Sequence, residues 1–216
     1  RMLPGQGRIV FNPRCDGKGK SRSDTTANQT SASEVIDRIS TLFEKNGAEE
    51  YLGEPVTIGA HMLQTAYFAA EAGGDEETVV AALLHDIGHF TSELGSFEMT
   101  DVVDRMHDDA GALLLEGVFP ESVVDCVRHH VAAKRYLCAV DAAYYNGLSA
   151  ASRHSLSLQG GPMDDAECKA FEEIPGFERI VMVRRCDDQG KISGMDVPPF
   201  ESYLPMMHRV AGIEAG

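Results

Sequence analysis

The sequence has few cysteines, few basic residues and no long apolar run. Its cysteines are odd in number and lack Cys-x-x-Cys spacing, which argues against a disulfide framework or a zinc ribbon. No stretch approaches the ~20 apolar residues of a membrane span, and the segment from Leu3 to Phe11 is too short and too broken by glycine for a signal peptide. We therefore expect reduced thiols and a cytoplasmic protein. The cysteines are Cys15, Cys126, Cys138, Cys168 and Cys186.

Basic residues are outnumbered, with 19 Lys and Arg against 34 Asp and Glu, for a formal net charge of -15. A nucleic acid or an anionic membrane would be repelled by this mean field, so we expect neither as a partner. An anionic substrate must then be held by a local cationic pocket.

The chain of 216 residues with 43% hydrophobic content is long enough for one well-buried core. Residues 1–33 are polar and rich in Gly, Ser, Thr, Asn and Lys, and we interpret them as a flexible arm. Residues 34–216 are expected to form one all-helical domain, because strand patterns are nearly absent. Hydrophobic periodicity and turn signals predict helices at about 33–46, 57–71, 75–84, 106–118, 122–130, 133–145, 149–158, 164–173, 176–187 and 200–210.

The sequence His85-Asp86-Ile87-Gly88-His89 directly follows an apolar run. Adjacent metal-binding side chains in a buried setting are costly unless an ion is present. Other histidines and a late aspartate fall on separate predicted helices, which is how metal sites are assembled inside helical bundles. One histidine alone would more often be an ordinary core or surface residue, but the whole set suffices for two metals. The set comprises His61, His85, Asp86, His107, His130 and Asp187.

This array resembles the HD-domain superfamily over roughly residues 57–190. Most members of that superfamily are metal-dependent phosphohydrolases, whereas a small subset are mixed-valent diiron oxygenases. Imidazole and carboxylate ligands suit iron, manganese or zinc, so the ligands do not separate these chemistries.

Segments around the metal residues resemble the PhnZ-type oxygenases of phosphonate catabolism, over about residues 50–207. The resemblance implies a helical HD-domain bundle with an Fe(II)/Fe(III) pair that uses O2 to cleave a carbon–phosphorus bond. The implied substrate is 2-amino-1-hydroxyethylphosphonate, giving glycine and phosphate, or an N-methylated or trimethylated analogue, giving the corresponding betaine. The matching segments are residues 51–54, 130–137, 148–153, 159–163, 171–173 and 184–191.

Carried over by this resemblance, Asp86 bridges the two irons. One iron takes His61, His85, Asp86 and Asp187, and the other shares Asp86 and takes His107 and His130. The resemblance also implies that Tyr51 occupies an iron position until substrate displaces it.

The resemblance assigns further residues to the substrate. A phosphonate dianion needs fixed cations and donors, and His89, Lys134, Ser152 and Arg184 are of these types. Lys134 lies one helical turn after His130 if that helix continues. Glu54 would accept from the substrate amine, and it lies three residues after Tyr51, so the two can share a face. Ser155, Gln159 and Arg153 also match, but they could equally shape the turn at Gly160 and Gly161.

Two other functions remain open at this point. One is an HD phosphohydrolase acting on a nucleotide or small phosphate ester through a metal hydroxide. The other is a ligand-sensing domain, which is disfavoured because degenerate sensors usually lose ligands. An anaerobic assay separates the hydrolase from the oxygenase.

Two details bear on substrate and partner. Cys186 stands where we expect an aromatic residue, so the pocket is predicted to differ there. An aromatic cage would mark a quaternary ammonium, but Tyr67, Phe68 and Phe90 are expected to be helix-core residues, and the sequence does not place them in such a cage. The oxygenase family implies a functional link to a separate phosphonate hydroxylase, without a stable complex.

Overall fold

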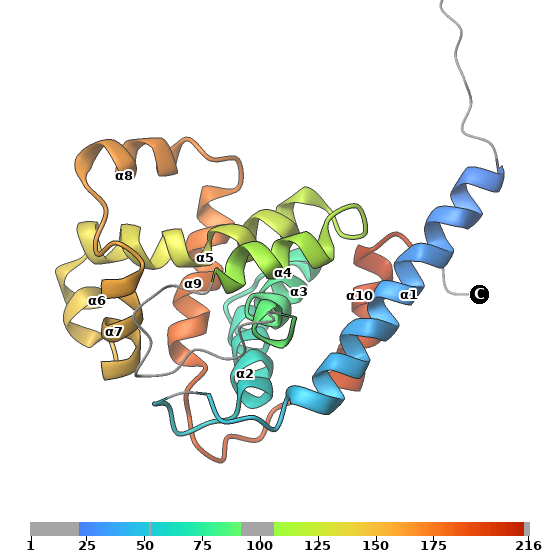
Figure 1. The fold of residues 1–216 in the computed structure, drawn as a ribbon, viewed down its shortest axis with the longest axis horizontal. Coiled ribbons are helices and arrows are strands. Elements are labelled where there is room, and N and C mark those ends of the chain that lie inside the picture. Colours follow the sequence, from blue (N-terminus) through green and yellow to red (C-terminus); the bar gives the residue numbers. More distant parts are fainter. Residues whose placement is uncertain (1–21, 52, 92–105, 214–216) are drawn as a thin grey trace, which may run out of the picture.

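The computed structural model describes residues 22–51, 53–91 and 106–213, with side chains described from Ala32 onward. This part of the chain is helical, as predicted, and its one β-type pairing is an isolated bridge between Glu50 and Thr57 (Figure 1). The elements are α1 (Arg22–Asn46), α2 (Ile58–Glu71), α3 (Glu76–Leu84), η1 (Ile87–Phe90), α4 (His107–Leu115), α5 (Glu121–Val140), α6 (Ala142–Gly147), α7 (Ala150–Leu158), α8 (Asp165–Glu172), α9 (Phe177–Gln189), η2 (Phe200–Tyr203) and α10 (Leu204–Val210).

Side-chain caps fix the starts of several helices close to the predicted positions. Thr57 accepts from the backbone N–H of Ala60 at the start of α2, and Asp75 accepts from that of Thr78 at the start of α3. Asp164 opens α8 with a reciprocal capping box. Such caps satisfy backbone donors that a helix start leaves without a partner.

Two helices differ from the prediction. Helix α1 begins at Arg22 rather than Ser33, so part of the predicted arm is helical, while residues 1–21 and the question of an arm there lie outside the described residues. Helix α5 is one continuous helix where we predicted two, 122–130 and 133–145. No glycine or proline interrupts residues 121–140, so nothing in the backbone requires a break. The end of the second predicted helix instead forms α6, capped by Asp141.

The core lies among α2, α3, α5 and α9. Helix α2 packs against α3 and α9, and α5 packs against α3, α4 and α9. Helix α3 has no exposed face from Thr78 to Leu84, so it is enclosed by the others. Helix α1 runs beside α10 (Figure 1). Phe43 on α1 also stacks on Phe200, the first residue of η2, with ring centroids 4.4 Å apart. The central helices carry three of the predicted metal ligands, His61 on α2, His130 on α5 and Asp187 on α9.

Two expectations from the sequence concern membrane spans and thiols in the described residues. No helix among them has the length and apolar content to cross a membrane. The cysteines there, Cys126, Cys138, Cys168 and Cys186, are free thiols, as predicted, and Cys15 lies outside the described residues.

Candidate active site

The predicted metal ligands come from five elements that meet in the core. His61 lies in the first turn of α2, His85 and Asp86 follow the end of α3, and His107 begins α4. Gly88 makes this meeting possible, because a Cβ there would lie 1.8 Å from the backbone oxygen of His107. Only glycine lets η1 approach the start of α4 so closely. His130 on α5 and Asp187 on α9 complete the set.

The histidines form two pairs. The Nε2 atoms of His61 and His85 lie 3.1 Å apart, and those of His107 and His130 lie 3.0 Å apart. Asp86 stands between the pairs, with Oδ2 3.4 Å from both Nε2 atoms of the first pair and Oδ1 3.4 Å from both of the second. One carboxylate thus offers one oxygen to each pair, which is the arrangement of a bridging ligand.

Asp187 joins only the first pair. Its Oδ1 lies 3.4 Å from Nε2 of His61, and its Oδ2 lies 3.7 Å from Nε2 of His85. We call His61, His85 and Asp187 the His61 group, and His107 with His130 the His107 group. The structure thus brings together, with Asp86 between them, the two sets of residues that the PhnZ-type resemblance implied as ligands.

The donor atoms of this site fit two cations. The Nδ1 atoms of His61, His85 and His130 donate to backbone carbonyls at 2.7–2.8 Å, so their Nε2 atoms direct lone pairs inward. Two such nitrogens about 3 Å apart need a proton between them or a cation beside them, and a bound metal ion would take the lone pairs of both. Oδ2 of Asp86 and Oδ1 of Asp187 are also buried without a hydrogen-bond partner. Buried polar atoms without a hydrogen-bond partner are rare in proteins, and a bound ion is one reason for them.

His89 lies beside the His107 group. Its Nε2 is 3.9 Å from Oδ1 of Asp86, and its ring stacks on His107 with centroids 4.2 Å apart. Burial and the neighbouring His107 lower the pKa of His89 to about 3. The ring is therefore neutral and keeps one N–H to offer to an anion, which is compatible with its predicted substrate role.

A cavity of about 70 Å³ opens beside the two groups. Tyr51 lines it, and so do the residues expected to bind substrate apart from Arg153, namely Glu54, His89, Lys134, Ser152, Ser155, Gln159 and Arg184. Arg153 does not line it, because its guanidinium donates to the carbonyls of Asn146 and Leu148.

A tight turn brings Tyr51 and Glu54 to the cavity together. The backbone N–H of Glu54 donates to the carbonyl of Tyr51 at 2.9 Å, and Gly53 has the positive φ of 72° that such a turn needs. The ring of Tyr51 stacks on His61 with centroids 4.3 Å apart. Burial, followed by the negative charges of Asp86 and Asp187, raises the pKa of Tyr51, so the phenol stays protonated.

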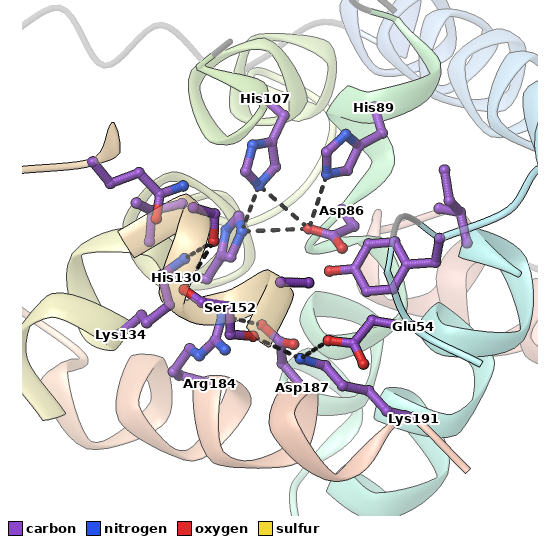
Figure 2. Close-up of a pocket in the computed structure, with 16 residues that line it drawn as sticks. Glu54, Asp86, His89, His107, His130, Lys134, Ser152, Arg184, Asp187 and Lys191 are labelled. Atoms are coloured by element: carbon purple, nitrogen blue, oxygen red, sulfur yellow. Dashed lines mark hydrogen bonds and ion pairs between the residues drawn. The ribbon is translucent and has the colours of Figure 1, made fainter. Parts of the chain in front are cut away.

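Two buried cations lie on the same side of the cavity (Figure 2). Lys134 Nζ donates to Oγ of Ser155 at 2.8 Å, and burial together with the charge of Arg184 lowers the pKa of Lys134 to about 7. Arg184 is already engaged, because its Nη1 donates to Oδ2 of Asp187 at 2.5 Å. Arg184 thus lines the cavity, but it also holds a metal-facing carboxylate.

Sequence reasoning missed three residues of this site. Lys191 lines the cavity, donates to Oγ of Ser152 at 2.9 Å and lies 3.2 Å from Oε1 of Glu54. Tyr144 accepts from Nε of Arg184 at 3.0 Å and donates to Oδ2 of Asp188 at 2.5 Å. The only signal was that Lys191 and Asp188 lie within the matching segment 184–191, where neither had a periodic or motif-based role.

Cys186 packs into the hydrophobic core and does not line the cavity. The expected difference in pocket shape at this position therefore stays a prediction. Tyr67, Phe68 and Phe90 are not among the lining residues either. Of the described aromatic residues other than histidine, Tyr51 alone lines the cavity.

Comparisons with known proteins agree with this geometry. The HD domain family matches residues 58–164. The chain is 52% identical to a [1-hydroxy-2-(trimethylamino)ethyl]phosphonate dioxygenase (glycine-betaine-forming) of Leisingera caerulea, over 84% of this chain and 93% of that protein. It is 41% identical to a hydroxymethylphosphonate dioxygenase of Gimesia maris, over 77% of this chain and 85% of that protein.

Proposed function

Since the chain belongs to the PhnZ-type phosphonate dioxygenases of the HD-domain family, we propose that it converts 1-hydroxy-2-(trimethylamino)ethylphosphonate and O2 to glycine betaine and phosphate. The protein is an oxidoreductase that cleaves a carbon–phosphorus bond. The observation that carries the proposal is a cavity with buried cations on one side, the carboxylate of Glu54 on the other, and two metal-ligand groups beside it (Figure 2).

The metals are proposed to be two irons. The His61 group and Asp86 would hold one, while the His107 group and Asp86 would hold the other. Bound iron supplies the one-electron changes that O2 activation requires and that zinc and magnesium cannot make. The backbone carbonyls that fix the imidazole rings keep this ligand set in place before substrate arrives.

The substrate carries opposite charges at its two ends, and the cavity matches both. Lys134, Ser152, Arg184 and the N–H of His89 would bind the phosphonate. Glu54 would bind the ammonium, since a carboxylate attracts a quaternary nitrogen without needing a hydrogen bond. Ser155 and Gln159 line the same cavity, and Oε1 of Gln159 is buried without a partner, so it is available to substrate.

Tyr51 is proposed to close the metal side of the cavity in the free enzyme. Its ring lies flat on His61, and its pKa is raised by burial and by the neighbouring carboxylates. Substrate would displace the Tyr51 side chain from this position. The protein thereby shields the metal side from solvent until the phosphonate is in place.

The phosphohydrolase and sensor alternatives are less well supported. The two relatives reported above are named as dioxygenases, and the oxygenase interpretation is supported by the residues expected as ligands, which lie close together beside the cavity. The remaining partner that we propose is functional rather than physical, namely a hydroxylase that supplies the 1-hydroxyphosphonate.

The test is oxygen dependence. Iron content is measured on the purified enzyme, and phosphate release is then followed with and without O2 on the trimethylamino, amino and hydroxymethyl substrates. We expect about two irons per chain, no phosphate without O2 and the highest kcat/KM on the trimethylamino compound. Full anaerobic phosphate release would contradict the proposal.

A further inference from the structure

Glu54 already has a cation beside it. Its Oε1 accepts from Oγ of Ser149 at 2.6 Å and lies 3.2 Å from Nζ of Lys191. The side chains of Glu54 and Lys191 are only 7% and 13% exposed, so solvent screens this ion pair weakly. The place at Glu54 that the proposed function gives to the substrate's cation is therefore taken.

Lys191 also reaches the part of the cavity proposed for the phosphonate. Its Nζ donates to Oγ of Ser152 at 2.9 Å, and Ser152 lines the cavity. Figure 2 shows Lys191 between Glu54 and Ser152, with Lys134 across the cavity. A single lysine thus contacts both regions that a zwitterionic substrate would use.

Among the described residues, the carboxylates that line the cavity are Glu54, Asp86 and Asp187. Asp86 and Asp187 face the histidine pairs, so Glu54 is the one left for a substrate cation. Two cations on one carboxylate oxygen would repel each other, more strongly in a buried site than in water. Lys191 and the substrate nitrogen therefore compete for Glu54.

We propose that Lys191 is an internal stand-in for the substrate cation and a specificity-determining residue. In the free enzyme its ammonium neutralises Glu54, and a cationic substrate displaces it toward Ser152 and the phosphonate. A substrate without a cationic group leaves the ion pair intact. This inference rests on the proposed function, because it takes Glu54 as the ammonium site.

The two relatives show why such a residue matters. One is named for a trimethylamino substrate and the other for hydroxymethylphosphonate, which has no cationic group. A buried Glu54 without a partner would disfavour the second type of substrate. Lys191 reduces this penalty, so the preference of the enzyme for cationic over cationless substrates should be smaller with Lys191 than without it.

The test removes the charge of Lys191 while keeping its length. We compare Lys191→Met with Lys191→Arg, which retains the cation, using oxygen-dependent phosphate release from the trimethylamino substrate and from hydroxymethylphosphonate. The measured quantity is the ratio of the two kcat/KM values, cationic over cationless. We expect Lys191→Met to raise this ratio about tenfold, the size of one strong charge interaction, and Lys191→Arg to change it less than about twofold. Lys191→Gln, which can still bond to Ser152, should act like Lys191→Met.

A double-mutant cycle ties the effect to Glu54. Glu54→Gln should lower the ratio, and Lys191→Met should no longer raise it in that background. Binding of [2-(trimethylamino)ethyl]phosphonate, which lacks the reacting hydroxyl, gives a second readout by calorimetry. Lys191→Met should tighten the binding of this compound more than it tightens the binding of methylphosphonate.

Two results would overturn the inference. An equal loss on both substrates would make Lys191 a phosphonate contact only, and a raised ratio that persists in Glu54→Gln would remove Glu54 from the explanation. Failure of the proposed function looks different, because wild-type enzyme would then release no oxygen-dependent phosphate from either compound.

Discussion

The metal-facing side of the cavity and its substrate-facing wall satisfy their polar groups in opposite ways. On the metal side, Oδ2 of Asp86 and Oδ1 of Asp187 are buried without hydrogen-bond partners. On the wall, Lys134 is bonded to Ser155, and Lys191 is bonded to Ser152 beside Glu54. The metal side therefore leaves carboxylate oxygens for bound ions, whereas the charged groups of the wall pair within the protein. Among the polar atoms of the wall, Oε1 of Gln159 is an exception, because it is buried without a hydrogen-bond partner.

This difference indicates how long a metal ion and a substrate each stay bound. A buried polar group without a partner costs about 1–3 kcal/mol, so a side built with several of them suits resident ions. A wall whose groups pair with each other suits a ligand that enters and leaves in every turnover. Specificity can then change on the wall while the metal ligands stay the same.

The strongest challenge to this comparison is Asp86→Ala. Removing the shared carboxylate should empty both metal positions and lower kcat by more than the ~100-fold that loss of an outer hydrogen-bond partner can cost. Elemental analysis and kcat measure this, with Asp109→Ala on the exposed part of α4 as the control. Retention of two metals by Asp86→Ala would show that the two groups are independent.

Lys134→Met tests the wall alone. Loss of a charge-assisted contact to the phosphonate should lower kcat/KM about 10- to 100-fold with iron content unchanged. Lys134→Arg keeps the positive charge and should lose less. A fall in bound iron in Lys134→Met would mean that the wall supports the metal side after all.

The same lysine predicts a pH dependence. Burial and Arg184 lower the pKa of Lys134 to about 7, and the phosphonate needs its protonated form. The kcat/KM value, which reports the free enzyme, should therefore fall about tenfold per pH unit above that pKa. Lys134→Arg should lose this fall, since arginine stays protonated. An unchanged profile in Lys134→Arg would assign the titration to another group.

Tyr144→Phe should have the smallest effect, because Tyr144 acts through Arg184. Removal of its hydroxyl leaves Arg184 bonded to Asp187 and Asp188, so kcat/KM should fall about fivefold, the size of one ordinary hydrogen bond. Tyr145→Phe, at an exposed neighbouring position, is the matched control. Equal effects of the two substitutions would argue that Tyr144 only stabilises α6.

The metal side was predictable from sequence because its chemistry needs particular residue types. A buried His85-Asp86 dyad and further histidines on separate helices indicate ligands wherever the chain packs them. The length of α5 was not predicted, although the continuity of this helix determines which of its residues line the substrate-facing wall of the cavity. The continuous helix sets Lys134 one turn beyond His130, so both line the same cavity.

The residues that sequence reasoning missed depend on contacts between distant segments. Lys191 lies just after α9, and its partner Glu54 lies in the turn before α2, so no periodic pattern relates them. Tyr144 on α6 contacts Arg184 on α9 for the same reason. Packing alone brings these pairs together, and a single sequence carries no direct signal of it.

The shared position of Asp86 also links the filling of the two metal positions. Its Oδ2 faces the His61 group and its Oδ1 faces the His107 group, so one carboxylate serves both. A metal ion held by one group would draw the Asp86 carboxylate into a fixed orientation. That orientation would present the other oxygen to a second ion, so occupation of one position would favour occupation of the other.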